Sequence, residues 1–245
     1  MDCGLYLYGI FPDFFPAEEV VLEGMDKQPV HSALIEGFSF LYSIAKQEKY
    51  FASRRNLICH EKVLEQAMNE GFRTLLPLRF GMVVKSWETV TEQLTKPYQD
   101  KLKDLFAKLA ERREVSVKIF WDNDSELQAL LSVNQELKRM RDAMSGKSLS
   151  MEEVINIGQM IEKGLSLRKQ EVIQTFQNQL NSLALEVVEN DPMTEGMIYN
   201  AAYLIPWDGE AEFSDRVEAI DQNFADRLRI RYNNLTAPYT FAQLS

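Results

Sequence analysis

The stretch VSVKIFW, from Val115 to Trp121, decides how the rest of the chain is read. Apolar and polar side chains alternate along it, which is typical of a strand with one buried face. One face carries Val115, Val117, Ile119 and Trp121, and the other carries Ser116, Lys118 and Phe120. Helix and strand patterns lie on both sides of this strand, so we place a domain boundary next to it, at Arg112.

The sequence from this strand onward predicts a second domain over residues 113–245. Apolar residues at three- and four-residue spacing predict a helical hairpin that ends near Leu180, and later a helix over Phe213–Leu228 capped by Ser214. Strands are predicted over Leu183–Val188, Met197–Ile205 and Arg229–Asn233. The order βαββαβ indicates a ferredoxin-like domain whose first crossover is enlarged by the helical hairpin.

Residues 1–112 predict a smaller domain of mixed sheet and helices. Its elements are a strand over Gly4–Ile10, a hairpin over residues 30–45, a helix over residues 53–71, a strand over residues 72–84 interrupted at Pro77, and a helix from Ser86 to Leu109 kinked at Pro97. The fold class is therefore α+β with two domains.

Local signals mark the ends and the packing of the helical hairpin. Ser150 and Glu153 form a capping box, and the acidic cluster that begins at Asp122 suits a helix cap better than a calcium loop, which needs a glycine and a glutamate that are absent here. Gly158 and Gly164 lie inside the second helix. We interpret them as sites of close packing, in preference to a hinge.

Composition excludes several classes of function. The 245-residue chain has a formal net charge of −10, which argues against nucleic-acid binding, and no apolar run is long enough to span a bilayer. The two cysteines, Cys3 and Cys59, are too few for a disulfide framework or a zinc site. With no signal peptide in view, they are typical of free thiols in the cytosol.

The usual enzyme signatures are absent: there is no glycine-rich phosphate loop and no nucleophile elbow. The chain has only two histidines, His31 and His60, in a predicted strand and a predicted helix. His60 follows Cys59, but neighbouring residues on a helix point about 100° apart, which disfavours a thiolate–imidazole pair. We expect structural or surface roles for these residues, and no metal, cofactor or catalysis.

Two sets of charged residues are candidates for a functional surface. If the polar faces of the second-domain strands align, they form a charged platform; the alternative is an ordinary solvated sheet face. This platform would contain Lys118, Glu186, Asn200, Arg229 and Arg231. Arg79 is the one charge in an apolar stretch, so we expect it to be paired and to order the join between the domains.

Four stretches together resemble the gas vesicle protein F/L family. They are Tyr6–Ile10, Leu76–Gly81 with the sequence LPLRFG, Val117–Trp121, and Asn200–Leu204. The ending Ala237–Phe241 is similar to the family's Pro-Tyr-aromatic ending, although the Gly-Pro-Trp that usually precedes it is replaced by Asn234-Leu235-Thr236. The resemblance spans nearly the whole chain.

This resemblance implies a minor component or assembly factor of gas vesicles, located at the vesicle or in the cytoplasm. It implies a non-catalytic protein that binds the small hydrophobic shell protein and contacts other gas vesicle accessory proteins. A shell subunit with exposed β edges aggregates unless its edges and apolar faces are covered before polymerisation. The alternative is a small-molecule-binding regulatory module, because ferredoxin-like domains host many such sites.

Overall fold

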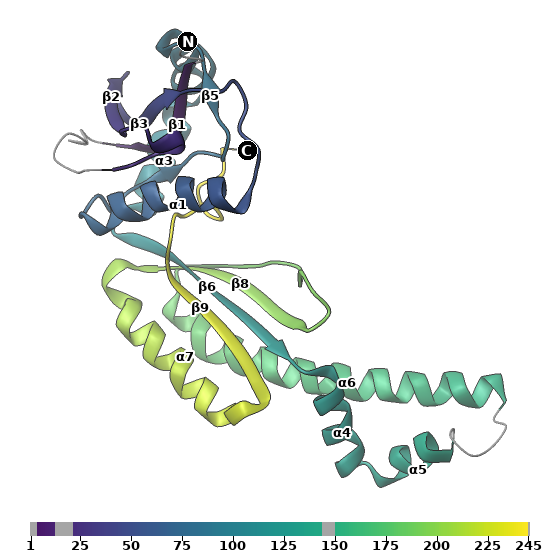
Figure 1. The fold of residues 1–245 in the computed structure, drawn as a ribbon. Coiled ribbons are helices and arrows are strands. Elements are labelled where there is room, and N and C mark those ends of the chain that lie inside the picture. The colour runs from purple at the N-terminus through teal and green to yellow at the C-terminus, as the bar shows by residue number, and fades with distance from the viewer. Residues whose placement is uncertain (1–3, 13–21, 144–149, 245) are drawn as a thin grey trace. The chain divides into compact units, whose positions relative to one another are not determined.

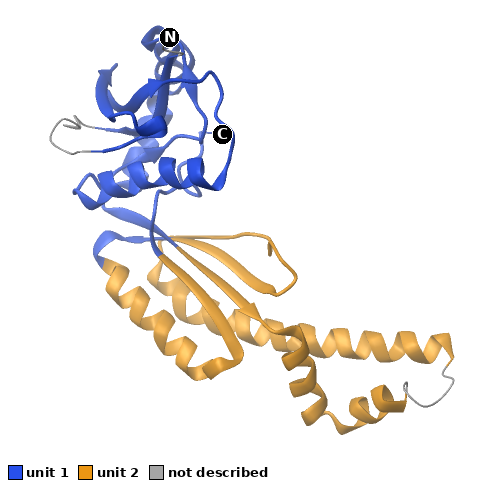
Figure 2. Ribbon diagram, viewed as in Figure 1, with its two compact units in different colours: residues 1–115, 204–208, 234–245 blue, residues 116–203, 209–233 orange. Residues whose placement is uncertain are grey.

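The computed structural model describes residues 4–12, 22–143 and 150–244. The chain divides into two compact units (Figure 2). Unit 1 contains residues 1–115, 204–208 and 234–245, and unit 2 contains residues 116–203 and 209–233. Each unit combines a sheet with helices, and the α+β class is confirmed.

Unit 1 is built on a central strand, β1 (Gly4–Phe11), that pairs on both edges (Figure 1). The sheet order is β2-β3-β1-β4, and β5 also pairs with β1. The other elements of this unit are η1 (Met25–Lys27), β2 (His31–Ile35), β3 (Phe38–Ala45), α1 (Arg54–Asn69), β4 (Leu76–Pro77), β5 (Val83–Val84), α2 (Trp87–Val90), η2 (Thr91–Thr95) and α3 (Lys96–Leu109).

The predicted hairpin is confirmed as β2 and β3, which pair antiparallel from His31 opposite Tyr42 to Ile35 opposite Phe38. The two turn residues, Glu36 and Gly37, both have positive φ, at 50° and 86°. Two successive positive φ angles are typical of the tight turn that matches the twist of a β-hairpin. Glycine tolerates this conformation without strain, which explains its place in the turn.

Helices cover both faces of the unit 1 sheet. On one face, Tyr6 packs against His60 of α1, and Val63 and Leu64 are fully buried. On the other face, Phe40 packs against Trp87 of α2, and Phe38 stacks on Phe106 of α3. The predicted helix over residues 53–71 is confirmed, with Ser53 as its N-cap.

Two segments of unit 1 are less regular than predicted. Residues 72–84 form only the two-residue strands β4 and β5, because the chain leaves the edge of β1 at Arg79–Gly81 before Val83 pairs again with Tyr6. The predicted irregularity near Pro97 is confirmed: residues 91–95 form a π-helical stretch, and Tyr98 has non-helical dihedral angles. Proline removes a backbone donor from the helix ladder, which accounts for this break.

Unit 2 follows the order βαββαβ. Its strands are β6 (Arg112–Trp121), β7 (Glu186–Glu189), β8 (Met197–Pro206) and β9 (Leu228–Thr236), in the spatial order β7-β8-β6-β9. The connections contain α4 (Asn123–Val133), α5 (Gln135–Ala143), α6 (Met151–Leu180), η3 (Asn181–Leu183), η4 (Trp207–Gly209), α7 (Glu210–Phe224) and η5 (Ala225–Arg227). The ferredoxin-like description of this unit stays a prediction.

The helices α6 and α7 pack on one face of the unit 2 sheet. Phe213 of α7 contacts Tyr203 of β8, and Phe224 stacks on Phe176 of α6. The expected cap at Ser214 is wrong, because α7 begins at Glu210 after Gly209, so Ser214 lies inside it. The apolar pattern started only at Phe213 and hid the polar first turn.

The helical crossover extends beyond the strands that it connects. Figure 1 shows α6 running past the end of the strands, with α4 and α5 beside its N-terminal half. The capping box of Ser150 and Glu153 is confirmed. Close packing is found at Gly164, where a Cβ would lie 2.7 Å from Leu130, but at Gly158, apart from its chain neighbours and the backbone of its own helix, no described atom lies within 4 Å of that position. Ser145 and Gly146, which follow the apolar stripe of the first predicted helix in the sequence and were expected to end that helix, lie outside the described residues.

The division into units differs from the predicted boundary, because residues 113–115, 204–208 and the last residues, 234–245, group with unit 1. Ala237 is fully buried in the unit 1 core, and Tyr239 packs against the same cluster. Sequence order suggested that everything after Arg112 belongs to one domain. Strand β9 instead carries the chain from unit 2 into unit 1, where the tail ends.

Candidate functional site

The face of the unit 2 sheet opposite α7 carries part of the predicted platform. The guanidinium carbons of Arg229 and Arg231, on β9, lie 4.7 and 5.0 Å from the ring centre of Phe120 on the adjacent strand β6. Lys118 lies two residues before Phe120 and therefore on the same face. The arrangement is a phenyl ring flanked by cations, an interaction worth about 0.5–1 kcal/mol at an exposed site.

The other two platform residues do not join this cluster. Asn200 is buried, and its side-chain amide donates a hydrogen bond to the backbone oxygen of Asp191 at 3.2 Å. It therefore fixes the turn between β7 and β8. Glu186 is exposed on β7, and β8 separates this strand from β6. A partner surface made of Lys118, Glu186, Arg229 and Arg231 stays a prediction.

The exposure of Arg79 differs from what its apolar neighbours in the sequence suggested. Its side chain is exposed, and within residues 4–12, 22–143 and 150–244 it has no hydrogen bond or ion pair. The expected pairing of Arg79 stays a prediction. Arg79 borders a pocket of about 500 Å³ in unit 1, together with Tyr98 of α3 and Tyr239 of the C-terminal tail. Its role in ordering the join between domains stays a prediction.

His60 is a structural residue of the unit 1 core. Its Nε2 donates to the carbonyl of Leu78 at 3.1 Å, so its Nδ1 accepts from the hydroxyl of Tyr6 at 3.0 Å. Burial lowers the pKa of His60 to about 4, so the ring is neutral at pH 7. The hydroxyl of Tyr6 also accepts from the N–H of Gly81, so the two residues hold the segment that leaves the sheet at Arg79.

The remaining candidates for chemistry have simple structural roles. Asp122 caps α4 by accepting a hydrogen bond from the N–H of Ser125 at 2.8 Å, as expected. Burial raises the pKa of the partly buried Cys59 thiol, which disfavours the reactive thiolate. His31 packs against Tyr42 on β3. Among the described residues, no group of three or more histidine, cysteine or acidic side chains is arranged to hold a metal ion.

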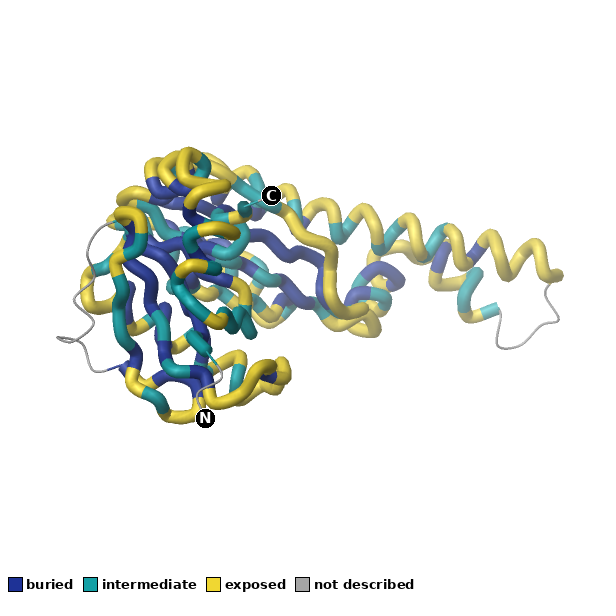
Figure 3. Tube along the Cα trace, turned by 90° about the horizontal axis from the view of Figure 1, so that it is seen from above, coloured by how far each residue is buried: buried dark blue, intermediate teal, exposed yellow. Residues whose placement is uncertain are grey.

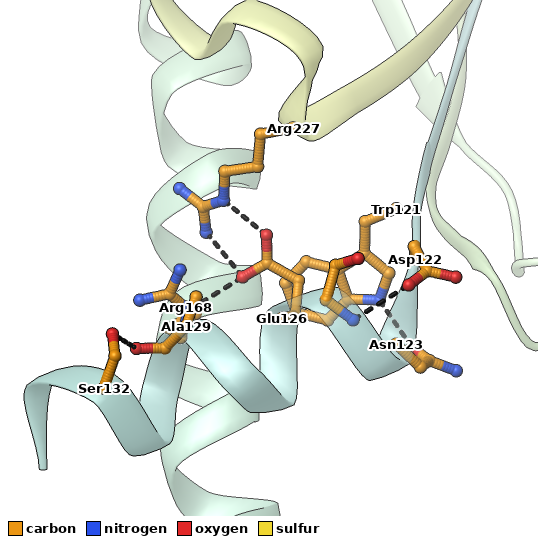
Figure 4. A network of polar contacts seen from close by, with 9 residues as sticks. Trp121, Asp122, Asn123, Glu126, Ala129, Ser132, Arg168 and Arg227 are labelled. Carbon is orange, nitrogen blue, oxygen red and sulfur yellow. Dashed lines mark hydrogen bonds and ion pairs between the residues drawn. The ribbon is translucent and has the colours of Figure 1, made fainter.

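A buried ion-pair cluster joins the helices of unit 2, and sequence reasoning missed it (Figure 4). Glu126 of α4 is 3% exposed and accepts from Nε of Arg168 on α6 at 2.8 Å and from Nε of Arg227 on η5 at 2.5 Å. Burial alone would raise the pKa of Glu126, but the two arginines outweigh it and hold this pKa below its ordinary value. One signal was available: Arg168 interrupts the apolar stripe between Leu165 and Val172.

A second buried carboxylate holds the C-terminal tail in unit 1. Glu114 of β6 is 5% exposed and accepts from the backbone N–H of Thr240 at 2.9 Å and from its hydroxyl at 2.7 Å. Burial, helped by the charge of Glu61, raises the pKa of Glu114 to about 7 although its hydrogen bonds to Thr240 lower it. Glu61 of α1 accepts from the N–H of Ala237 at 3.4 Å. Neither glutamate was a predicted site residue.

The outer edge of β2 is open among the described residues, since β2 ends the sheet order and pairs only with β3. Leu34, the last residue but one of β2, is 59% exposed. Because the two-residue turn makes Ile35 and Phe38 the hydrogen-bonded pair that closes the hairpin, the backbone groups of Ser32 and Leu34 face away from β3. An open strand edge is a template for pairing with another strand.

Residues 4–243 match the model of one protein family, described as gas vesicle synthesis protein GvpL/GvpF. The chain belongs to this family. It is 68% identical over 244 residues to gas vesicle protein F of Microcystis aeruginosa strain PCC 7806, with both chains covered completely. It is 22% identical to gas vesicle protein L1 of Halobacterium salinarum strain NRC-1, over 98% of this chain and 90% of that protein.

The fold also matches solved structures of this family. The crystal structure of gas vesicle protein GvpF from Microcystis aeruginosa superimposes with a TM-score of 0.87 and 68% identity, covering 99% of this chain and 100% of that one. The resemblance drawn from LPLRFG and the three other stretches is therefore confirmed, and with it a gas vesicle-associated role. Among the described residues, no helix is both long and apolar enough to cross a membrane.

Proposed function

We propose that this GvpL/GvpF family member is a non-catalytic assembly factor that binds the hydrophobic shell protein of gas vesicles and supports vesicle formation. The observation that carries the proposal is the open edge of β2. Adding a strand to such an edge supplies backbone hydrogen bonds for affinity and side-chain contacts for specificity. Pairing of this kind would cover one β edge of a shell subunit before polymerisation and so suppress aggregation.

The sequence of β2 supports this use. The strand has the sequence HSALI, so it carries no proline or lysine of the kind that blocks unwanted pairing at sheet edges. Leu34 presents an exposed apolar side chain on the strand. We place the contact with the shell protein at Ser32 and Leu34, whose backbone groups face outward. Contacts with other gas vesicle accessory proteins are a second part of the same proposal.

The test is co-expression of the tagged chain with the shell protein, followed by affinity capture and quantification of the shell protein retained. Ser32→Pro removes an outward N–H but leaves the β2–β3 ladder intact. One lost hydrogen bond of about 1 kcal/mol corresponds to roughly fivefold weaker binding, and the proline ring adds steric exclusion. Ser32→Thr keeps the N–H and is the matched control. Ala33→Pro removes a donor that faces β3 and serves as the destabilised reference.

We expect Ser32→Pro to lose most of the retained shell protein while its melting temperature stays near that of Ser32→Thr. Retention by Ser32→Pro equal to wild type would show that the β2 edge is not the contact. No retention by wild type would contradict the proposed function itself.

Salt distinguishes this contact from a charge-driven one. The screening length falls from about 10 Å at 0.1 M to about 3 Å at 1 M salt. We expect retention to change little over this range, and little in the variant with Lys118, Arg229 and Arg231 all replaced by Ser. Loss in high salt together with loss in the triple variant would instead assign the contact to the platform.

A further inference from the structure

Unit 2 contains a groove that the proposed function does not use. It has a volume of about 450 Å³ and lies between α6, the start of α4, the end of β6 and the start of β8. Its apolar lining includes Trp121, Leu127, Ile161 and Leu165. A concave, mainly apolar surface with a few polar groups is the usual form of a binding site.

The groove continues as an exposed apolar face along the N-terminal half of α6. Met151, Val154 and Ile155 are 82%, 40% and 54% exposed, and they lead at helical spacing to Gly158, which lines the groove. Apart from its chain neighbours and the backbone of its own helix, no described atom lies within 4 Å of a Cβ built at Gly158, so another chain can approach closely there. Figure 3 shows this part of α6 as largely exposed.

An adjacent side of α6 is already occupied. Ile157 is 5% exposed, and Gly164 is in tight contact with Leu130 of α4. The face from Met151 to Leu165 is open at its N-terminal end, where Met151, Val154 and Ile155 are exposed, whereas Ile161 and Leu165 pack in part against the cluster of Leu130, Leu131 and Leu137. The face spans fourteen residue steps, or about 21 Å at 1.5 Å per residue, the length of about four helical turns.

Charge decides which helix fits this face. The rim of the groove carries Asp124, Glu162 and Glu195 against one cation, Lys169. The rim is therefore net negative, on a chain whose formal net charge is −10. A partner with cations beside its apolar face is attracted by this rim, and a partner with carboxylates there is repelled.

We propose that this groove docks an amphipathic helix of a partner protein, with its apolar side on Met151 to Leu165 and lysine or arginine residues along its flank. The mode is the helix-in-groove one, in which apolar anchors at positions i, i+3 or i+4, and i+7 fill the groove. This surface lies in unit 2, and the β2 edge lies in unit 1, so the two proposals concern different sites.

The experiment titrates the full chain into labelled synthetic helices and follows fluorescence anisotropy. Three 18-residue peptides are compared: one with leucine on one face and lysine on the other, its leucine and glutamate counterpart, and a scrambled leucine and lysine peptide with no apolar face. We expect the amphipathic lysine peptide to bind at least tenfold more tightly than each of the other two. Equal binding of the scrambled peptide would reduce the effect to net charge and overturn the proposal.

Variants then locate the binding. Gly158→Leu fills the groove, and because leucine favours helix more than glycine does, this variant should remain folded. It should weaken binding of the amphipathic lysine peptide at least fivefold. Glu162→Lys should weaken binding of the same peptide. Glu171→Lys makes an equal charge change at an exposed position of α6 outside the groove, so it should weaken binding only as much as the change in net charge does.

Binding by Gly158→Leu equal to wild type, or equal losses in Glu162→Lys and Glu171→Lys, would overturn the groove as the site. The peptides contain no shell protein sequence, so these results are independent of the capture experiment on the β2 edge.

Discussion

Two buried glutamates, one in each unit, have opposite preferences for charge. Glu126 is 3% exposed in unit 2 and Glu114 is 5% exposed in unit 1. Two arginines lower the pKa of Glu126, whereas Glu114 is hydrogen-bonded to Thr240 and burial raises its pKa to about 7. Burial disfavours the charged form of both residues, so the partner decides the outcome.

The comparison also shows what each carboxylate holds together. Glu126 joins α4, α6 and η5, and so fixes the base of the helical crossover. Glu114 joins the start of β6 to the C-terminal tail. Both glutamates connect segments more than 40 residues apart along the chain, but only Glu126 does so as an ion pair.

The largest effect is expected for Glu126→Ala, which leaves Arg168 and Arg227 without their carboxylate. Breaking a buried pair costs about 3–5 kcal/mol, and we expect the lower end because both arginines reach solvent in part. At about 2–4 °C per kcal/mol, the melting temperature should fall by roughly 6–12 °C. Calorimetry measures it, with Glu171→Ala as the exposed control. A fall no larger than in the control would mean that the cluster contributes little.

The second prediction concerns pH and Glu114. A carboxylate whose pKa is raised from 4.5 to about 7 contributes stability that is present below pH 4.5 and is lost as the pH rises through 7. Glu114→Gln lacks this titration. Between pH 5 and pH 8, its free energy of unfolding should therefore rise relative to wild type, by about 2–3 kcal/mol.

Urea unfolding at the two pH values measures this change. Subtracting the free energy of unfolding of wild type from that of the variant removes the contribution of groups that titrate in both proteins. Glu126→Gln is the matched control. The pKa of Glu126 is lowered, so its contribution is lost only when the pH falls below its ordinary range, and the variant should show no relative change between pH 5 and pH 8. Parallel pH dependence of Glu114→Gln and wild type would place the pKa of Glu114 near its ordinary value.

The third prediction separates the two contacts of the tail. Thr240→Val removes a hydroxyl that donates to Glu114 at 2.7 Å, and Thr236→Val removes one that lies 3.4 Å from Glu61. We expect Thr240→Val to lower the free energy of unfolding by about 1 kcal/mol. Thr236→Val should lower it clearly less, because the longer contact is weak. The cost of Thr240→Val should be greater at pH 8, where Glu114 is ionised. Equal costs for both variants would assign the tail's stability to packing.

Much of the fold follows from the sequence because it depends on short-range patterns. The alternation in Val115–Trp121, the hairpin turn at Gly37 and the capping box at Ser150 are each decided by residues a few positions apart. Glu114 and Glu126 could not be placed in the same way. Their partners lie at least 42 positions away, and only the fold shows which of many charged residues are buried together.

The family resemblance had a different basis. It rested on the order and spacing of four stretches, of which LPLRFG was the most distinctive, and it was confirmed along residues 4–243. The same stretch does not by itself place the side chain of Arg79. Leu76 and Leu78 are buried, as the pattern indicated, but the chain leaves the sheet edge directly after Leu78 and turns Arg79 toward solvent.

The smallest effect is therefore expected for Arg79→Ala, which extends the comparison from carboxylates to arginines. Arg168 and Arg227 are partly buried against Glu126, whereas Arg79 is exposed and has no ion pair among the described residues. Surface substitutions of this kind usually change stability by less than about 0.5 kcal/mol, or about 1–2 °C here. Arg168→Ala, measured beside it, should lower the melting temperature several times more. A comparable fall in Arg79→Ala would show that Arg79 is held by a partner and would support its predicted role at the domain join.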